Sequence, residues 1–255
     1  MLPDAVRLAV GMLTALRVGP PRQVDRRVAG SAMVLAPLAV LPLAAAVTVV
    51  ALAGARTDLP TLVVAFLAIA ALALGSRAFH LDGLSDTVDG LTSSYDRERS
   101  LEVMRSGTAG PAGVVAVVLV LGTQVAALGA VLSRPRGTAS AVLAGVVVCA
   151  SRAALALCCL RGVAAARADG LGRAYTGTVR PPVTAAVWLV CAAALAGAAA
   201  GAGLPWWRGV LAAAVMAVVV GLLLVRTGAR LGGVSGDVLG AAIELALTAG
   251  LVVLS

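Results

Sequence analysis

The chain has 255 residues, of which 60% are hydrophobic and 13% charged, and its mean hydropathy is +1.01. Soluble domains average about 45–50% apolar and about 25% charged residues, so the composition argues against an ordinary soluble enzyme, a disordered chain or a disulfide scaffold. The net charge of +8 comes without a clustered basic face interleaved with aromatics, so it does not indicate nucleic-acid binding. We expect an all-α, polytopic integral membrane helical bundle, forming a single domain over residues 1–255.

The N-terminal segment 1–30 is predicted to lie at the membrane interface. Residues 1–18 are interrupted by Asp4, Arg7 and Arg17, unlike the apolar core of a signal peptide. Polar residues gather on one side of a helix drawn through this stretch and leucines lie elsewhere, which is typical of an interfacial helix. A short additional span is the alternative for this stretch.

Seven later stretches are apolar enough to cross a bilayer, for which about 20 residues are needed. They are residues 31–53, 59–79, 112–132, 138–160, 183–203, 207–225 and 239–254. The first contains Pro37 and Pro42 and the last is short, so the predicted total is about six to eight transmembrane helices.

The loops between these spans differ sharply in charge. If residues 1–18 do not cross, segments 1–30, 80–111, 161–182 and 226–238 share one side, which carries 15 of the 20 arginines when Arg77, at the adjoining helix end, is counted with its loop. The positive-inside rule makes this side cytoplasmic. A transporter would place ionisable groups near the midplane, whereas this chain places them at one face, as a membrane enzyme with a water-soluble substrate would.

The densest polar feature is FHLDGLSDTVDGL, residues 79–91, at the start of the predicted 80–111 loop. No helix breaker separates it from the preceding span, so the helix can run on into it. Asp82, Asp86 and Asp89 then lie within roughly 60° of arc. At about 6 Å and an effective dielectric constant of about 20, each carboxylate pair costs roughly 3 kcal/mol. A divalent metal, arginine partners or protonation must compensate, unless the stripe is simply a solvated helix face.

The surrounding residues suggest what compensates. Arg97, Arg99 and Arg105 follow in sequence and are candidate partners. Oxygen ligands without cysteine suit Mg²⁺ or Mn²⁺ better than zinc. His80, the only histidine, is a candidate general base or a helix-end histidine bonded to backbone. Gly83 is expected where a ligand or another backbone comes close.

Two glycine-containing clusters follow at the same face. Arg167–Arg173 reads RADGLGR, whose arginines are phosphate clamps or ordinary loop charges. Residues 232–237 read GGVSGD and precede Gly240 and Glu244, which lies on the same helix face as Asp237. This segment offers backbone N–H groups to an anion or supplies an N-cap, Ser235 or Asp237, to the last helix.

The run HLDGLSDTVDG, residues 80–90, resembles the signature HLDGLADxxDG of the cobalamin synthase family, the adenosylcobinamide-GDP ribazoletransferases. Three more stretches resemble the family in the same order, namely LEVMR at 101–105 followed by Gly110 and Gly113, RADGLG at 167–172, and GGVSGDVLGA at 232–241. Ser106 and Thr108 stand where the family pattern usually has Asp and Arg. The resemblance covers most of the chain.

The resemblance implies a reaction that joins adenosylcobinamide-GDP with α-ribazole or its 5′-phosphate, giving adenosylcobalamin or its 5′-phosphate and releasing GMP. It also implies a Mg²⁺ cofactor and a prokaryotic cytoplasmic membrane, with the active-site loops facing the cytoplasm. On this reading Asp82, Asp86 and Asp89 are catalytic and hold the metal, and the base is one of them or His80. The implied substrate-binding residues are Arg105, Arg167, Gly170, Ser235, Gly236, Asp237 and Glu244.

Other diphosphate-using membrane enzymes match less well. CDP-alcohol phosphotransferases carry DGxxAR, and this chain lacks the AR pair. Membrane prenyltransferases carry DxxDxxxD, whereas the gaps here run DxxxDxxD. A transporter component is the alternative from another class. The lipid bilayer is an expected partner, and a homo-oligomer is compatible with the sequence.

Overall fold

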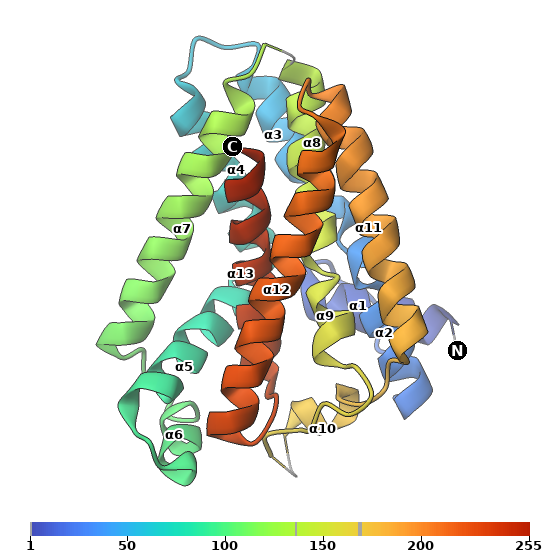
Figure 1. The fold of residues 1–255 in the computed structure, drawn as a ribbon, viewed down its shortest axis with the longest axis vertical. Helices are drawn as coiled ribbons and strands as arrows, with labels where there is room; N and C mark the ends of the chain where they lie inside the picture. Colours follow the sequence, from blue (N-terminus) through green and yellow to red (C-terminus); the bar gives the residue numbers. More distant parts are fainter. Residues whose placement is uncertain (1, 136, 168–169) are drawn as a thin grey trace.

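The computed structural model describes residues 2–135, 137–167 and 170–255, and regular structure in them is helical (Figure 1). Residues 160 with 179 and 165 with 234 form isolated parallel bridges. The helices are α1 (Leu2–Leu13), α2 (Arg26–Ala39), α3 (Leu41–Gly54), α4 (Thr61–Gly75), α5 (Phe79–Ser93), α6 (Arg97–Val103), α7 (Pro111–Leu132), α8 (Gly137–Ser151), α9 (Ala154–Cys158), α10 (Leu171–Tyr175), α11 (Pro181–Gly201), α12 (Trp206–Leu231) and α13 (Gly236–Leu254).

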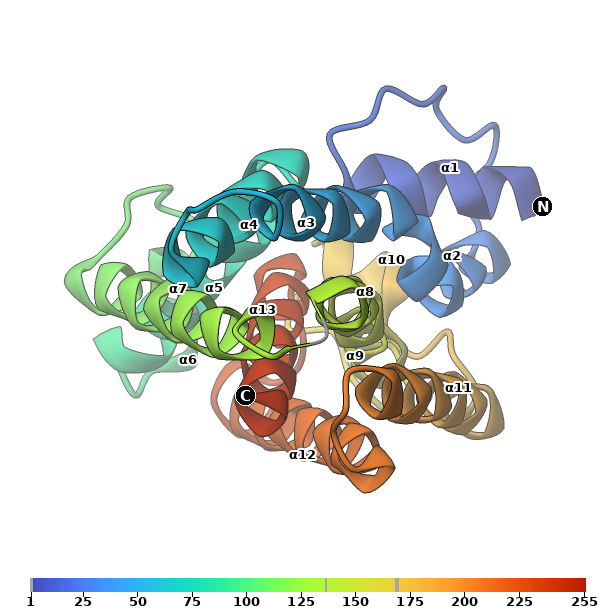
Figure 2. The same cartoon turned by 90° about the horizontal axis from the view of Figure 1, so that it is seen from above.

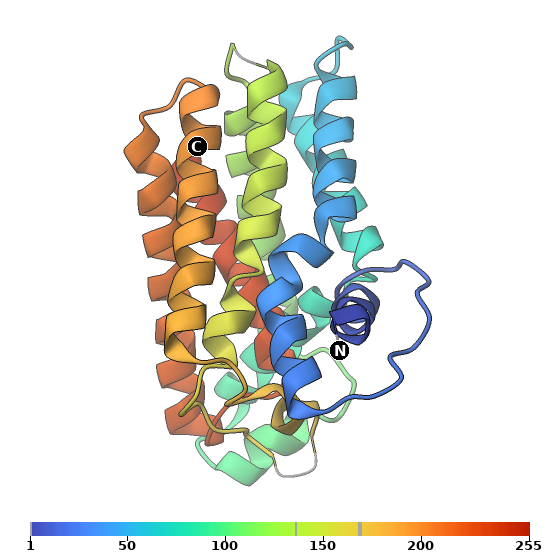
Figure 3. The ribbon, with the colours of Figure 1, turned by 90° about the vertical axis from the view of Figure 1, so that its right-hand side faces the viewer.

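The described chain has six helices long and apolar enough to cross a membrane, or seven if the bent pair α4–α5 is one span. Helices α2 and α3 together form one of them, Arg26–Gly54, and α8 and α9 another, Gly137–Cys158. The long helices run side by side along the molecule (Figure 3). This confirms the predicted polytopic helical bundle, and the spans begin and end within a few residues of the predicted ones except where α12 continues to Leu231.

Helix α1 lies across the bundle rather than along it (Figure 3). Its 12 residues, at 1.5 Å each, extend about 18 Å, less than the roughly 30 Å of a hydrocarbon core. The alternative of a further span is therefore wrong. The helix buries Ala5, Ala9 and Leu13 and packs mainly against α2.

The expected continuous helix from span two into the acidic segment is also wrong. The axes of α4 and α5 are bent by 88°, because Arg77 and Ala78 adopt left-handed φ angles of 58° and 55°. Two hydrogen bonds to backbone carbonyls hold the bend: the Ala78 N–H donates to the Ala73 carbonyl at 2.8 Å, and the Arg77 guanidinium donates to the Gly11 carbonyl at 2.7 Å. The same guanidinium lies 4.6 Å from the centre of the Phe79 ring.

The predicted loops are shorter than expected. Most of the 80–111 segment is helical, as α5 and α6, and the 226–238 loop shrinks to residues 232–235 because α12 runs to Leu231. The 161–182 segment stays largely irregular around the short α10. Ala168 and Asp169, within the predicted Arg167–Arg173 cluster, lie outside the described residues.

Helix α13 is the central element of the bundle (Figure 2). It contacts α5, α7, α8, α9 and α12. Two thirds of the residues in its most apolar stretch are buried inside the bundle. The surrounding helices turn large apolar side chains outward, among them Leu119, Leu189 and Leu222, as lipid-facing helices do. The first turn of α13, which carries the glycine-rich motif, is thereby placed against α5.

Candidate active site

Helices α5 and α13 cross at a contact made by glycines. A Cβ placed on Gly83 would lie 2.7 Å from the Asp237 carbonyl oxygen, and one on Gly240 would lie 3.1 Å from the His80 carbonyl oxygen. A side chain on Gly83 would push the helices apart, and one on Gly240 would require a shift of a few tenths of an ångström. The crossing brings Asp82 of α5 to the first turn of α13, so two motifs far apart in sequence form one site.

Two cavities adjoin this crossing and share Gly236 and Asp237. The larger, about 330 Å³, lies between α1, α5, α10 and α13. Its polar lining consists of Arg77, His80, Asp82, Tyr175 and Asp237. The smaller, about 150 Å³, is lined by Arg167, Gly170, Gly172, Val234, Ser235, Gly236 and Asp237. The sequence-predicted residues of α5 and α13 therefore meet at one place with those of the 161–182 segment.

Three carboxylates come close enough to repel one another here. The Asp86 carboxylate interacts electrostatically with those of Asp82 and Asp237, and the Asp237 carboxylate interacts with that of Asp82. Asp237 is also near the Arg167 guanidinium and accepts a 3.1 Å hydrogen bond from Ser235 Oγ. Asp82 is exposed and Asp86 half-buried, and within the described chain neither accepts a hydrogen bond or pairs with an arginine. Within the described chain, no side chain therefore balances their charges.

Arg97 and Arg99, expected to balance the acidic stripe, do not. Arg97 donates from Nε to the Leu231 carbonyl and from Nη2 to the Ala166 carbonyl, each at 2.8 Å. Arg99 pairs with Glu102 at 2.7 Å. Both guanidinium groups are therefore engaged elsewhere. Arg105 is exposed beyond the end of α6 and lies outside the walls of both cavities.

Asp89 faces a different helix from the other acidic residues of α5. Its Oδ2 accepts the Gly110 N–H at 2.7 Å and its Oδ1 accepts the Gly113 N–H at 2.8 Å. The carboxylate thus caps the first turn of α7, where its charge also favours the helix dipole. A Cβ on Gly113 would lie 2.3 Å from Asp89 Oδ2, which explains glycine there. The described residues contain no preassembled group of three metal-ligand side chains, so metal binding by Asp82, Asp86 and Asp89 stays a prediction.

His80 and Glu244 form a buried pair behind the larger cavity. His80 Nδ1 lies 3.7 Å from Glu244 Oε1, and each residue is only 5% exposed. Neither ring nitrogen of His80 has a hydrogen-bond partner among the described residues. Glu244 accepts a 2.9 Å hydrogen bond from Gln124 and lies near the fully buried Arg152. Of this pair, only His80 lines the cavity.

The glycine-rich turn before α13 is held by backbone pairing. Ser235 Oγ accepts the Val238 N–H and caps α13, so the N-cap interpretation of this motif is confirmed. The isolated parallel bridge between Ala165 and Val234 fixes the 161–167 segment beside the turn. Arg167 is thereby held at the wall of the smaller cavity.

Two cavity residues were missed by sequence reasoning. Tyr175, in α10, lines the larger cavity, and burial raises the pKa of its phenol. Arg77 was counted only as a loop charge, yet it lines the same cavity and connects the α4–α5 bend to α1. Each stands close in sequence to a predicted motif, and that proximity was the available signal.

The family model described as cobalamin-5-phosphate synthase matches residues 5–255. The chain belongs to the cobalamin-5-phosphate synthase family. It is 53% identical over 246 residues to the adenosylcobinamide-GDP ribazoletransferase of a Nocardioides species, with 96% of each chain covered. The enzyme of the same name from Frankia casuarinae is 41% identical, with 98% of this chain and 93% of the relative covered. That from Klebsiella pneumoniae is 39% identical, with 71% and 70% covered.

No solved structure matches this member of the cobalamin-5-phosphate synthase family. Membership over nearly the whole chain confirms the family predicted from the motifs, and the shared name of the relatives is that of a transferase. The candidate site at the crossing of α5 and α13 therefore belongs to a protein whose relatives are named adenosylcobinamide-GDP ribazoletransferases.

Proposed function

We propose that this membrane transferase joins adenosylcobinamide-GDP with α-ribazole or its 5′-phosphate and releases GMP. One observation carries the proposal beyond family membership: His80, Asp82 and Asp237 line the larger cavity, and Asp237 and Arg167 line the smaller cavity that adjoins it. A diphosphate-cleaving reaction uses carboxylates, an arginine and a base, and the two adjoining cavities offer all three.

In the proposed reaction, a ribose hydroxyl oxygen of the acceptor attacks the phosphorus on the corrinoid side of the diphosphate. A new P–O bond forms there, the P–O bond to the guanosine-side phosphate breaks, and GMP leaves. The hydroxyl proton passes to a base on the protein. Phosphoryl transfer of this kind depends mainly on positioning and on neutralising the phosphate charges.

The donor set fits Mg²⁺, which commonly binds one or two carboxylates together with substrate phosphates. Asp82 and Asp86 have oxygens without a cationic partner in the described chain, and Asp237 lies beside them. When bound, the ion would neutralise the diphosphate oxygens. We assign Asp82 and Asp86 to this role, with Asp237 next to them, and assign Asp89 to the cap of α7 on the evidence of its two backbone hydrogen bonds.

The smaller cavity suits phosphate oxygens. Arg167 lies in its wall, and the N-terminal turn of α13, with Ser235 and Gly236, faces the same space. Helix N-termini and arginine are both favourable for phosphate. At about 150 Å³ the cavity is too small for a nucleoside or a corrin ring, so we assign it to the diphosphate.

His80 is the proposed base. It is buried, it lines the larger cavity, and its ring nitrogens are without hydrogen-bond partners in the described chain. The larger cavity, at about 330 Å³, lies at the low end of sizes that enclose drug-sized ligands. It is too small for the corrin ring, which would stay outside against the membrane surface while the reacting end enters.

We further propose that the site faces the cytoplasm of a prokaryotic cell. The α5, α6 and α10 helices and the start of α13 lie at one end of the bundle (Figure 1). That end carries most of the arginines, and the positive-inside rule assigns it to the cytoplasm.

The reaction can be tested with detergent-purified protein supplemented with lipid. We expect GMP release from adenosylcobinamide-GDP only when α-ribazole or its 5′-phosphate is present, and loss of release in EDTA. Folded protein that instead consumes a CDP-alcohol or a prenyl diphosphate, with no GMP from the corrinoid substrate, would overturn the proposal.

A further inference from the structure

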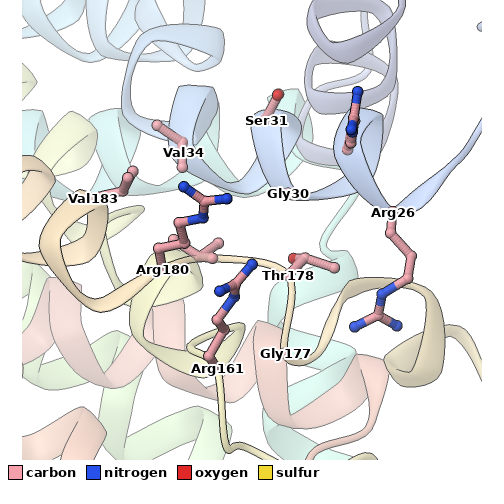
Figure 4. Close-up of a pocket in the computed structure, with 11 residues that line it drawn as sticks. Arg26, Gly30, Ser31, Val34, Arg161, Gly177, Thr178, Arg180 and Val183 are labelled. Carbon is pink, nitrogen blue, oxygen red and sulfur yellow. The ribbon is translucent and has the colours of Figure 1, made fainter.

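A separate cavity lies between the N-terminal ends of α2 and α11 (Figure 4). Its volume is about 570 Å³, and four arginines line it, namely Arg26, Arg27, Arg161 and Arg180. Its eleven lining residues include no Asp or Glu. The proposed reaction uses none of these residues, so the concentration of positive charge needs another explanation.

Backbone pairing places two of the arginines together. The Arg161 N–H donates to the Val179 carbonyl at 2.8 Å, and the Val179 N–H donates to the Cys159 carbonyl at 2.9 Å. These bonds form the parallel bridge between Leu160 and Val179. Arg161 and Arg180 each follow one residue of this bridge, and their side chains extend toward the same side of the cavity (Figure 4). Two like charges are therefore held side by side by the main chain.

Helix α2 closes the opposite wall at close range. A Cβ on Gly30 would lie 3.1 Å from the Thr178 carbonyl oxygen, so glycine lets α2 pack directly on the segment before Arg180. Arg26 donates to the Thr176 carbonyl at 3.1 Å. The carboxylate of Asp25, next to it in sequence, accepts the Val28 N–H and caps α2. Across the described chain no acidic side chain pairs with Arg27, Arg161 or Arg180.

We propose that this arginine cavity binds the phosphate of a net-anionic phosphate ester. Guanidinium groups bind phosphate oxygens in pairs, and Arg suits that geometry better than other cations. Val34 and Val183 form an apolar part of the wall, so the cavity accepts an amphiphile as well as a small ester. The shared chemistry is a phosphate, supplied by an anionic phospholipid or by a soluble ester.

The experiment uses the whole protein in neutral detergent and measures binding rather than activity. One arm titrates dioleoylphosphatidylglycerol and dioleoylphosphatidylcholine by native mass spectrometry, and the other titrates glycerol 3-phosphate by calorimetry. The test variant is Arg161→Gln/Arg180→Gln. The control variant, Arg17→Gln/Arg226→Gln, removes two exposed arginines that line none of the cavities described above.

We expect the wild type and the control to bind the anionic lipid, the soluble ester or both, with at least about tenfold weaker binding in the test variant, because each charged hydrogen bond is worth about tenfold or more. The arm that shows this loss identifies the source of the phosphate. If the double variant unfolds, Ser31→Asp serves instead, because it adds a carboxylate to the wall and leaves all four arginines in place. This variant should weaken binding similarly. Equal binding by wild type and both cavity variants in both arms, or an equal loss in the control, would overturn the proposal.

Discussion

Gly83 and Asp237 are in direct contact through their backbones, although one lies in α5 and the other in the first turn of α13. A Cβ on Gly83 would lie 2.7 Å from the carbonyl oxygen of Asp237 and 3.0 Å from its Cα. This contact sets how closely the carboxylate-bearing face of α5 approaches the glycine-rich turn. The site therefore depends on a residue that has no chemistry of its own.

Gly83→Ala should abolish most GMP release. Alanine favours a helix over glycine by about 1 kcal/mol, but the added methyl cannot fit against fixed backbone, so α5 and α13 must separate. The measurement is GMP release together with the thermal unfolding midpoint. Gly122→Ala on α7 is the matched control, because a Cβ there meets nothing within 4 Å. Normal activity in Gly83→Ala would show that the close crossing is not required.

Asp89→Asn should act mainly on stability. The amide keeps only one acceptor oxygen for the two N–H donors of Gly110 and Gly113, and it removes a charge that favours the α7 N-terminus. We expect a loss of about 1–2 kcal/mol in the free energy of unfolding, measured by chemical denaturation in detergent. An unchanged stability with lost activity would mean that Asp89 acts on the substrate instead.

Ala78→Gly should stabilise the protein. Ala78 holds a φ of 55° at the α4–α5 bend, a conformation that costs a non-glycine residue about 1–2 kcal/mol. The thermal unfolding midpoint should therefore rise, with activity retained. Ala73→Gly, within regular helix α4, should instead destabilise by about 1 kcal/mol. A fall in the midpoint of Ala78→Gly would contradict the strained bend.

His80→Gln should lower kcat by about 10²–10⁴-fold, the usual contribution of a general base, with little change in KM. Its ring nitrogens lack hydrogen-bond partners in the described chain, so the substitution should leave the unfolding midpoint nearly unchanged. If kcat is retained, the base is one of the aspartates.

Much of the fold could be predicted from hydropathy. Long apolar stretches must pair their backbone groups internally to cross a membrane, so the spans follow from composition. The sharp bend at Arg77 and Ala78 could not be predicted, because neither residue type ordinarily breaks a helix and the bend is held by Gly11, far away in sequence.

The sequence predicted which residues form the site better than it predicted which groups those residues contact. Helical spacing placed Asp82, Asp86 and Asp89 on one stripe, but it carries no information on which neighbouring helix each faces. In the structure Asp89 contacts α7, whereas Asp82 lines the cavity beside α13, and the spacing could not predict this difference. The long side chain of Arg97 likewise reaches backbone carbonyls of α12 and the 161–167 segment instead of the nearby carboxylates.

The central claim is that Asp82 and Asp86 supply the metal ligands of a phosphoryl-transfer site at the α5–α13 crossing. The most direct test is GMP release against Mg²⁺ concentration for wild type, Asp86→Asn and Asp89→Asn, each checked for folding. We predict that Asp86→Asn needs at least about tenfold more Mg²⁺ for half-maximal release, or gives none, while Asp89→Asn keeps the wild-type midpoint. A wild-type Mg²⁺ midpoint and rate in Asp86→Asn would contradict the account.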